Sequence, residues 1–227
     1  MHQRFNDNKK EVVRMELKSA KRGVGMIYIG EILSLCAVVL AAVSSVIVAL
    51  SATNGGTTNI SDGGLAGIGL IAILAFIAVF LAFIFQVVGI GRASKEEPEF
   101  KKAMAFLIGG LIVSFVAGFF GNSEVVKDIA GMLGNFCNLM VTIYIIQGCS
   151  YLAKKVGDEH VEKMASSTVK IITALYVVSI LLGLVTAFIS SREMVVVAGI
   201  LAIVIAVVSV IAYILFLKVL SQTKNIL

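Results

Sequence analysis

The sequence LAGIGLIAILAFIAVFLAFIFQVVGIG at residues 65–91 contains no charged residue. A transmembrane helix needs about 20 mostly apolar residues to cross roughly 30 Å of hydrocarbon, so this run is long enough to span a bilayer. Five further apolar runs occur along the chain, at Gly25–Leu50, Ala103–Gly121, Val125–Tyr151, Val169–Ser190 and Val195–Leu220. The pattern predicts an all-α fold: a polytopic membrane protein built as a six-transmembrane-helix bundle.

The composition supports the same conclusion. Of the 227 residues, 59% are hydrophobic and 15% are charged, and the mean hydropathy is +1.00. Soluble domains usually carry about 25% charged residues. An ordinary soluble domain is therefore excluded.

The basic residues are distributed unequally between the two sides of the membrane. In an alternating topology, all of the 19 Lys and Arg except Lys127 and Arg192 fall on one side. By the positive-inside rule that side is cytoplasmic, so the chain is predicted to be N-in/C-in. The basic charge then indicates contact with anionic inner-leaflet lipids in the bilayer, and no nucleic acid. The short loops favour a multi-pass protein of the bacterial cytoplasmic membrane.

Three segments are predicted. Residues 1–24 form a basic cytoplasmic N-terminal segment, residues 25–221 the six-helix transmembrane domain, and residues 222–227 a short cytoplasmic tail. Within the first segment Val13, Leu17 and Ala20 recur at helical spacing, which is typical of an amphipathic helix on the membrane surface. A solvated tail is the alternative, and both remain open.

Two charged connectors resemble each other: GRASKEEPEFKKA at 91–103 and KKVGDEHVEKMA at 154–165. Ala-Gly pairs also open three of the runs, at 66–67, 130–131 and 198–199. Three repeated helical hairpins would explain both features. Another Ala-Gly pair lies at 117–118 in a chain with 21 glycines, so coincidence is the competing interpretation.

Small residues recur at helical spacing within the runs, for example Gly30 and Ala37 in the first and Ala75 and Ala82 in the second. Membrane helices associate through close packing of small residues and through hydrogen bonds between helices. These stripes are predicted to be the contact faces of the bundle.

Glu31 lies inside the first apolar run, about five residues beyond Met26. An ionisable residue inside the membrane is costly and by default indicates a function. Here that function would be proton or cation coupling, or contact with a partner. Five residues span only about 8 Å of helix, so contact with inner headgroups or with a cytoplasmic lysine is the alternative.

The fourth run is the most polar. Asn135, Asn138 and Thr142 follow one face, and Gln147 follows a neighbouring one. Amides in hydrocarbon need partners. They are expected either to bond to Ser and Thr of other helices or to line a wet cavity, with this helix at the centre of the bundle. Gln86, at a similar inner depth, is the natural companion of Gln147. The candidate intramembrane polar site comprises Glu31, Gln86, Asn135, Asn138, Thr142 and Gln147.

No catalytic function is expected. The sequence contains neither HExxH nor GxSxG, and the two histidines, His2 and His160, lie in polar segments. The three cysteines fall inside apolar runs without metal-ligand spacing. We therefore expect no catalytic residue, no cofactor and no metal.

Six runs in a chain of this length, with Ala37 and Ala41 four residues apart in the first, resemble the substrate-binding subunits of energy-coupling-factor vitamin importers. That resemblance implies a role in small-molecule uptake. The long basic N-terminal segment departs from that family's pattern.

The sequence supports two functions. The first is a small-molecule or ion transport component, indicated by Glu31 and the polar fourth run. The alternative is a non-transporting membrane subunit or scaffold of a larger complex, in export, immunity or envelope stress. The alternative is favoured by runs without proline, since the only proline is Pro98 in a connector. It would bring a protein partner, and a homo-oligomer forming a pore is a third arrangement.

Overall fold

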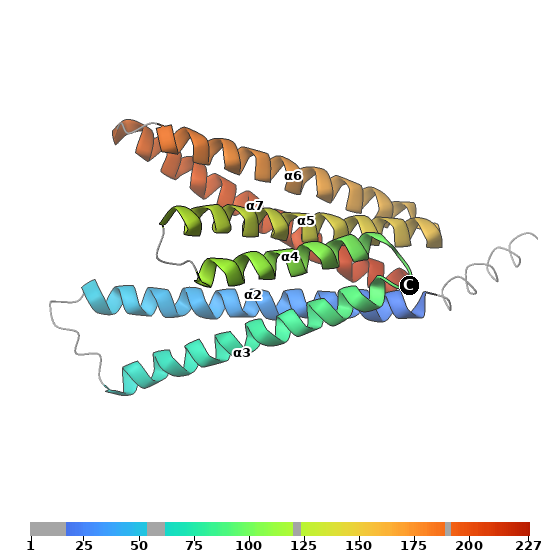
Figure 1. The fold of residues 1–227 in the computed structure, drawn as a ribbon, viewed down its shortest axis with the longest axis horizontal. Coiled ribbons are helices and arrows are strands. Elements are labelled where there is room, and N and C mark those ends of the chain that lie inside the picture. The colour runs from blue at the N-terminus through green and yellow to red at the C-terminus, as the bar shows by residue number, and fades with distance from the viewer. Residues whose placement is uncertain (1–16, 54–61, 120–123, 189–191) are drawn as a thin grey trace, which may run out of the picture. The chain divides into compact units, whose positions relative to one another are not determined.

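The computed structural model describes residues 17–53, 62–119, 124–188 and 192–227 of the chain. Within these residues the chain is helical, without strands (Figure 1). The helices are α2 (Lys18–Thr53), α3 (Asp62–Ala93), α4 (Glu99–Phe119), α5 (Glu124–Val156), α6 (Glu159–Phe188) and α7 (Arg192–Ile226). Each of the six contains a segment long and apolar enough to cross a membrane. The predicted all-α, six-helix architecture of a multi-pass membrane protein is confirmed.

The helices extend beyond the apolar runs that predict them. α2 begins at Lys18, before Gly25, and α6 begins at Glu159, before Val169. A helix satisfies its own backbone hydrogen bonds, and Lys, Glu, Met and Ala all favour it. The helix therefore continues past the apolar run until a capping residue ends it.

Such a cap separates α5 from α6. Gly157 has a φ of 78°, and its N–H donates to the carbonyl of Lys154 at 3.1 Å. Glycine adopts this left-handed conformation without the steric cost of a Cβ. The Asp158 carboxylate then accepts a 3.0 Å bond from the Val161 N–H and caps the start of α6. Two residues thus suffice to connect the two helices.

The chain divides into two compact units. The first, here the hairpin unit, is Gly25–Gly89 and contains most of α2 and α3. The second, here the main unit, comprises Met1–Val24 and Ile90–Leu227. Each is described by itself.

In the main unit, α5 packs against α4, α6 and α7, and α6 also packs against α7. The prediction that the fourth apolar run is central is confirmed for this unit. The predicted threefold hairpin repeat stays a prediction.

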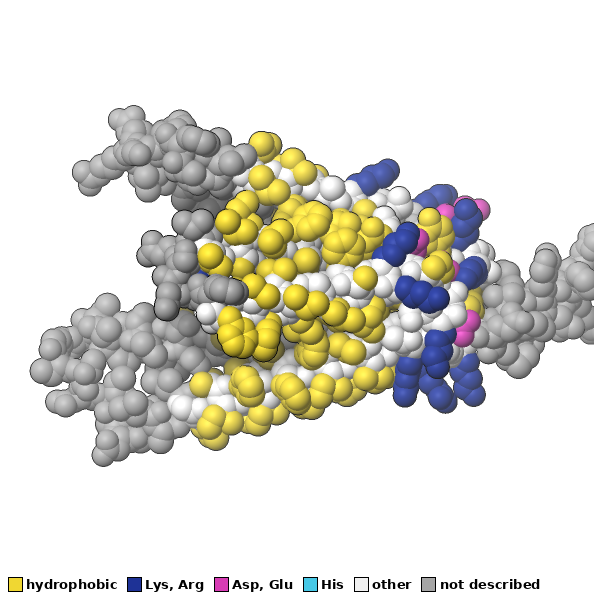
Figure 2. Space-filling model, viewed as in Figure 1, with side chains coloured by type: hydrophobic (Ala, Val, Ile, Leu, Met, Phe, Trp, Pro, Cys, Tyr) yellow, Lys and Arg dark blue, Asp and Glu magenta, His cyan; other side chains and the backbone are white. Residues whose placement is uncertain are grey.

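Nearly all described Lys and Arg side chains gather at one end of the main unit's helices (Figure 2). This basic end carries Lys101, Lys154, Lys163 and Lys224, while Lys127 lies near the opposite end of α5. Such a distribution is what the predicted topology requires of the main unit.

Buried side chains in α4 to α7 are confined to the same end. Where side chains are described, every buried residue lies in the half of its helix next to the basic end. These residues are Phe100, Ala103, Val141, Ile145, Ile146, Gly148, Cys149, Leu152, Ala153, Val156, Val161, Ala165, Thr168, Ala212, Phe216, Val219, Leu220 and Thr223. The opposite halves, called the far halves below, expose large apolar side chains such as Phe115, Met132 and Ile203.

Candidate intramembrane polar site

Glu31 and Gln86 meet inside the hairpin unit. Nε2 of Gln86 in α3 donates a 2.8 Å hydrogen bond to Oε1 of Glu31 in α2, and both side chains are half-buried. Glu31 lies nine residues beyond Arg22, which corresponds to about 14 Å along the helix. The carboxyl group is therefore held by an amide of the neighbouring helix within the apolar segment.

Gly30 makes this meeting possible. A Cβ at Gly30 would lie 2.9 Å from the carbonyl oxygen of Ala82 and 3.1 Å from Cγ of Gln86. Ala37 and Ala82 are both buried as well. The predicted small-residue contact faces of the first two runs thus meet here, and the close approach brings Gln86 within reach of Glu31.

The amides of α5 do not behave in the same way. Asn135 and Asn138 are exposed, whereas Thr142 and Gln147 are half-buried. Among the described residues no hydrogen bond joins Asn135 or Asn138 to a neighbouring helix. The Thr142 hydroxyl donates to the carbonyl of Asn138 at 3.1 Å, within its own helix.

Several described serine hydroxyls bond within their own helices. Each donates to the carbonyl four residues earlier in its own helix, at 2.8–2.9 Å: Ser44 and Ser45 in α2, Ser114 in α4, Ser179 in α6 and Ser209 in α7. This local bonding is the common way for Ser and Thr to satisfy themselves in a helix. The hydrogen bonds between helices expected for Asn135 and Asn138 do not form among the described hydroxyls.

The structure thus brings together two of the six predicted site residues from different helices, Glu31 and Gln86. Asn138 and Thr142 are joined within α5. The predicted companionship of Gln86 with Gln147 involves residues of different units, and it stays a prediction.

An ion pair at the basic end was not anticipated from the sequence. Nζ of Lys155 in α5 lies 2.7 Å from Oε2 of Glu97, and it also donates to the carbonyl of Glu96 at 2.8 Å. The Glu97 side chain is only 7% exposed. The pair fastens the connector between α3 and α4 to the end of α5. The sequence shows acids in one connector and lysines after the fourth run. Which acid pairs with which lysine depends on how the helices pack.

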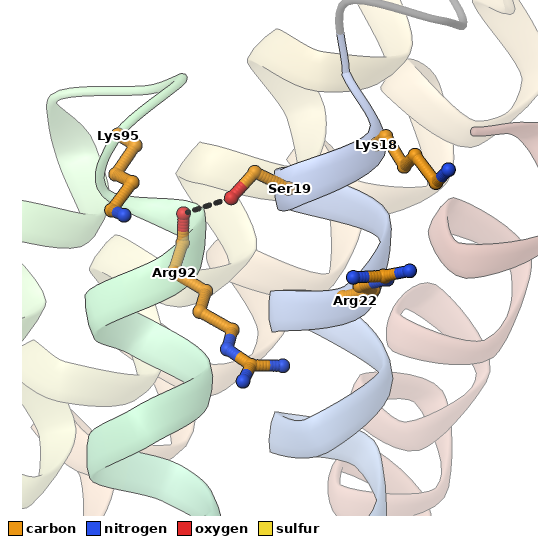
Figure 3. Close-up of a pocket in the computed structure, with 5 residues that line it drawn as sticks. All are labelled: Lys18, Ser19, Arg22, Arg92 and Lys95. Carbon is orange, nitrogen blue, oxygen red and sulfur yellow. Dashed lines mark hydrogen bonds between the residues drawn. The ribbon is translucent and has the colours of Figure 1, made fainter.

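A cavity at the basic end was also not predicted from the sequence. It has a volume of about 330 Å³ and is lined by Lys18, Ser19, Arg22, Arg92 and Lys95. All five belong to the main unit, in the first turns of α2 and at the end of α3 (Figure 3). The sequence contained a signal for it: basic residues precede the first span and follow the second. Consecutive antiparallel spans begin and end at the same membrane face, which brings these residues to one end. Their charges had been assigned to topology alone.

No group of three or more His, Cys, Asp or Glu able to hold a metal ion occurs among the described residues. Comparisons of the chain with protein families, with curated proteins and with solved structures find no match.

Proposed function

We propose that the chain is a small-molecule or ion transport component of a bacterial cytoplasmic membrane, with Glu31 as its proton- or cation-binding group. The observation that carries the proposal is the hydrogen bond between Gln86 and Glu31 inside the apolar segments of α2 and α3. Ionisable residues in such segments are rare and mark ion pathways and proton relays. A carboxyl group can bind and release a proton or cation, whereas a purely structural contact would be served by two amides.

The far halves of the main unit support the proposal. Asn135 and Asn138 are exposed there, in a part of α5 without described buried side chains. Exposed amides offer hydrogen-bond donors and acceptors to a polar solute.

The test uses purified protein reconstituted into liposomes adsorbed on a solid-supported membrane. Rapid pH steps are applied, alone and with a panel of amino acids, sugars, nucleosides and metal cations. We expect a charge displacement in the wild type that is lost in Glu31→Gln. The matched control is Glu162→Gln, an acid near the start of α6 at the basic end. Absence of any displacement in the wild type, or its persistence in Glu31→Gln, would contradict the proposal.

The second candidate function is a non-transporting membrane subunit. It is favoured by the same exposed amides, because Asn135 and Asn138 could bond to a partner helix in the membrane. Affinity purification from native membranes in mild detergent, followed by mass spectrometry, tests it. A stoichiometric partner that is lost in Asn138→Leu and kept in Met132→Leu would support this function. Recovery of the chain alone would count against it.

A further inference from the structure

The cavity at the basic end has strongly positive walls. Lys18 and Arg22 come from the first turns of α2, Arg92 from the last turn of α3, and Lys95 from the turn that follows. No acidic residue is among the described residues that line it. Figure 3 shows the Arg92 side chain extending into the space beside α2. Four cations around one cavity repel one another, and an anion between them would remove that repulsion.

Three lysines at the same end differ from these four cations because they are ion-paired. Lys102, Lys155 and Lys163 each form an ion pair, with Glu99, Glu97 and Glu159 respectively. No ion pair with a described carboxylate involves Lys18, Arg22, Arg92 or Lys95. All four side chains are exposed. No described carboxylate lies within ion-pair distance of these four cations, so the cavity keeps its positive charge among the described residues.

The two walls are joined through the backbone. Oγ of Ser19 lies 3.4 Å from the carbonyl oxygen of Arg92, to which it donates a hydrogen bond. This bond links the first turn of α2 to the last turn of α3. The bond uses only a hydroxyl group and a backbone carbonyl, so the guanidinium groups of Arg22 and Arg92 do not take part in it.

The charge and size of the cavity suit a phosphate group. Arginine presents paired N–H donors that match two oxygens of a phosphate, and lysine adds a point charge. A volume of about 330 Å³ lies at the lower end of the range for small-molecule sites. Basic pockets between transmembrane helices at the cytoplasmic face are known to accept phospholipid headgroups.

We propose that this cavity is a binding site for a phosphate-bearing anion, held by Arg22 and Arg92 and flanked by Lys18 and Lys95. The phosphate comes either from the headgroup of an anionic phospholipid or from a soluble phosphate compound. This site is separate from the carboxyl group assigned to transport, and it does not depend on that function.

The experiment has two arms on the detergent-purified full chain. In the first, phosphatidylglycerol is titrated and bound lipid is counted by native mass spectrometry, with phosphatidylcholine as the zwitterionic reference. In the second, inorganic phosphate is titrated by calorimetry. Each arm compares the wild type with Arg22→Gln/Arg92→Gln, a substitution that retains the backbone carbonyl used by Ser19.

The matched control is Lys101→Gln/Lys154→Gln. It removes the same charge from exposed residues at the basic end, outside the cavity. Circular dichroism verifies that both variants keep their helix content.

We expect the dissociation constant to rise about tenfold or more in the arginine variant, and to change less than about threefold in the control. Loss confined to phosphatidylglycerol identifies a lipid headgroup site, and loss confined to inorganic phosphate identifies a soluble ligand. Equal binding by the wild type and the arginine variant in both arms would overturn the proposal. An equal loss in the control would do so too, because it would show only general attraction to a basic surface.

Discussion

The Phe100 ring of α4 lies directly on the backbone of α5 at Gly148. A Cβ at Gly148 would come within 2.5 Å of Cε2 of that ring. Phe100 is fully buried, and Phe106 of α4 also stacks on Tyr144 of α5 with ring centroids 5.6 Å apart. A glycine facing an aromatic ring therefore sets how closely the two helices approach at the basic end.

Gly148→Ala is expected to destabilise the protein. The added methyl group must displace a buried ring, and overpacking of this kind costs about 1–3 kcal/mol. The better helix propensity of alanine offsets about 1 kcal/mol of that cost. The change is measured as a lower midpoint of thermal unfolding in detergent.

Gly134→Ala in the same helix is the control, because nothing lies within 4 Å of its added Cβ. Its midpoint should stay the same or rise. If both alanine variants unfold at the same midpoint, the contact of Phe100 with Gly148 does not contribute to stability.

Lys155→Met should cost about 1–3 kcal/mol of unfolding free energy, because it leaves the buried Glu97 carboxylate without its counter-ion. Lys163→Met is the comparison. In its ion pair with Glu159 the two side chains are 79% and 81% exposed, so its loss should cost less than about 0.5 kcal/mol. Denaturant titration of both variants measures the difference.

The double variant Glu97→Leu/Lys155→Met separates pairing from packing. Removal of both charges should recover most of the stability lost in Lys155→Met. A double variant less stable than the single one would show that Glu97 acts through other contacts.

Gln86→Leu should lower stability by about 1 kcal/mol, since it removes the donor to Glu31 from the hairpin unit. Glu31→Gln keeps an oxygen that can accept the same bond, so its thermal midpoint should stay within a few degrees of the wild type. Thermal unfolding of the two variants provides the comparison. A large loss of stability in Glu31→Gln would mean that the negative charge itself holds the helices together.

Truncation along α7 should show where the main unit is held together. Leu220 is fully buried, and Leu220→Ala should cost about 2–4 kcal/mol. Ile214 is 58% exposed, and Ile214→Ala should cost less than about 1 kcal/mol. The midpoints of thermal unfolding of the two variants are compared. Equal decreases in the midpoint would contradict the assignment of the core to the basic end.

The number of helices and the end to which the basic residues belong were both predictable from the sequence. An uncharged run such as residues 65–91 can cross a bilayer only as a helix. The charge of each loop between runs can be counted without knowing its contacts. The capped turn at Gly157 and Asp158 was equally local in origin, although the apolar run did not reveal that α6 begins at Glu159. Residues that act through their own helix or loop are thus accessible to sequence reasoning.

The partners of the polar residues were less accessible. The sequence marked Glu31 and Gln86 separately and did not pair them, because depth along a helix says nothing about the direction of a side chain. The bond between Glu31 and Gln86 depends on the absence of a Cβ at Gly30. In the same way, Ser and Thr were expected as partners of amides in other helices, yet the hydroxyls of Ser114 and Ser209 bond to their own helices.

The confinement of buried side chains to the basic end determines how the main unit responds to its lipids. The far halves of α4 to α7 expose large apolar side chains and contain no described buried residue, so we expect bilayer thickness to influence their tilt. A thinner membrane should increase the tilt of these segments about the packed end, and a thicker one should decrease it. Lipid composition should thereby change the spacing of the far helix ends, while the contacts around the buried Phe100 and Leu220 stay as they are.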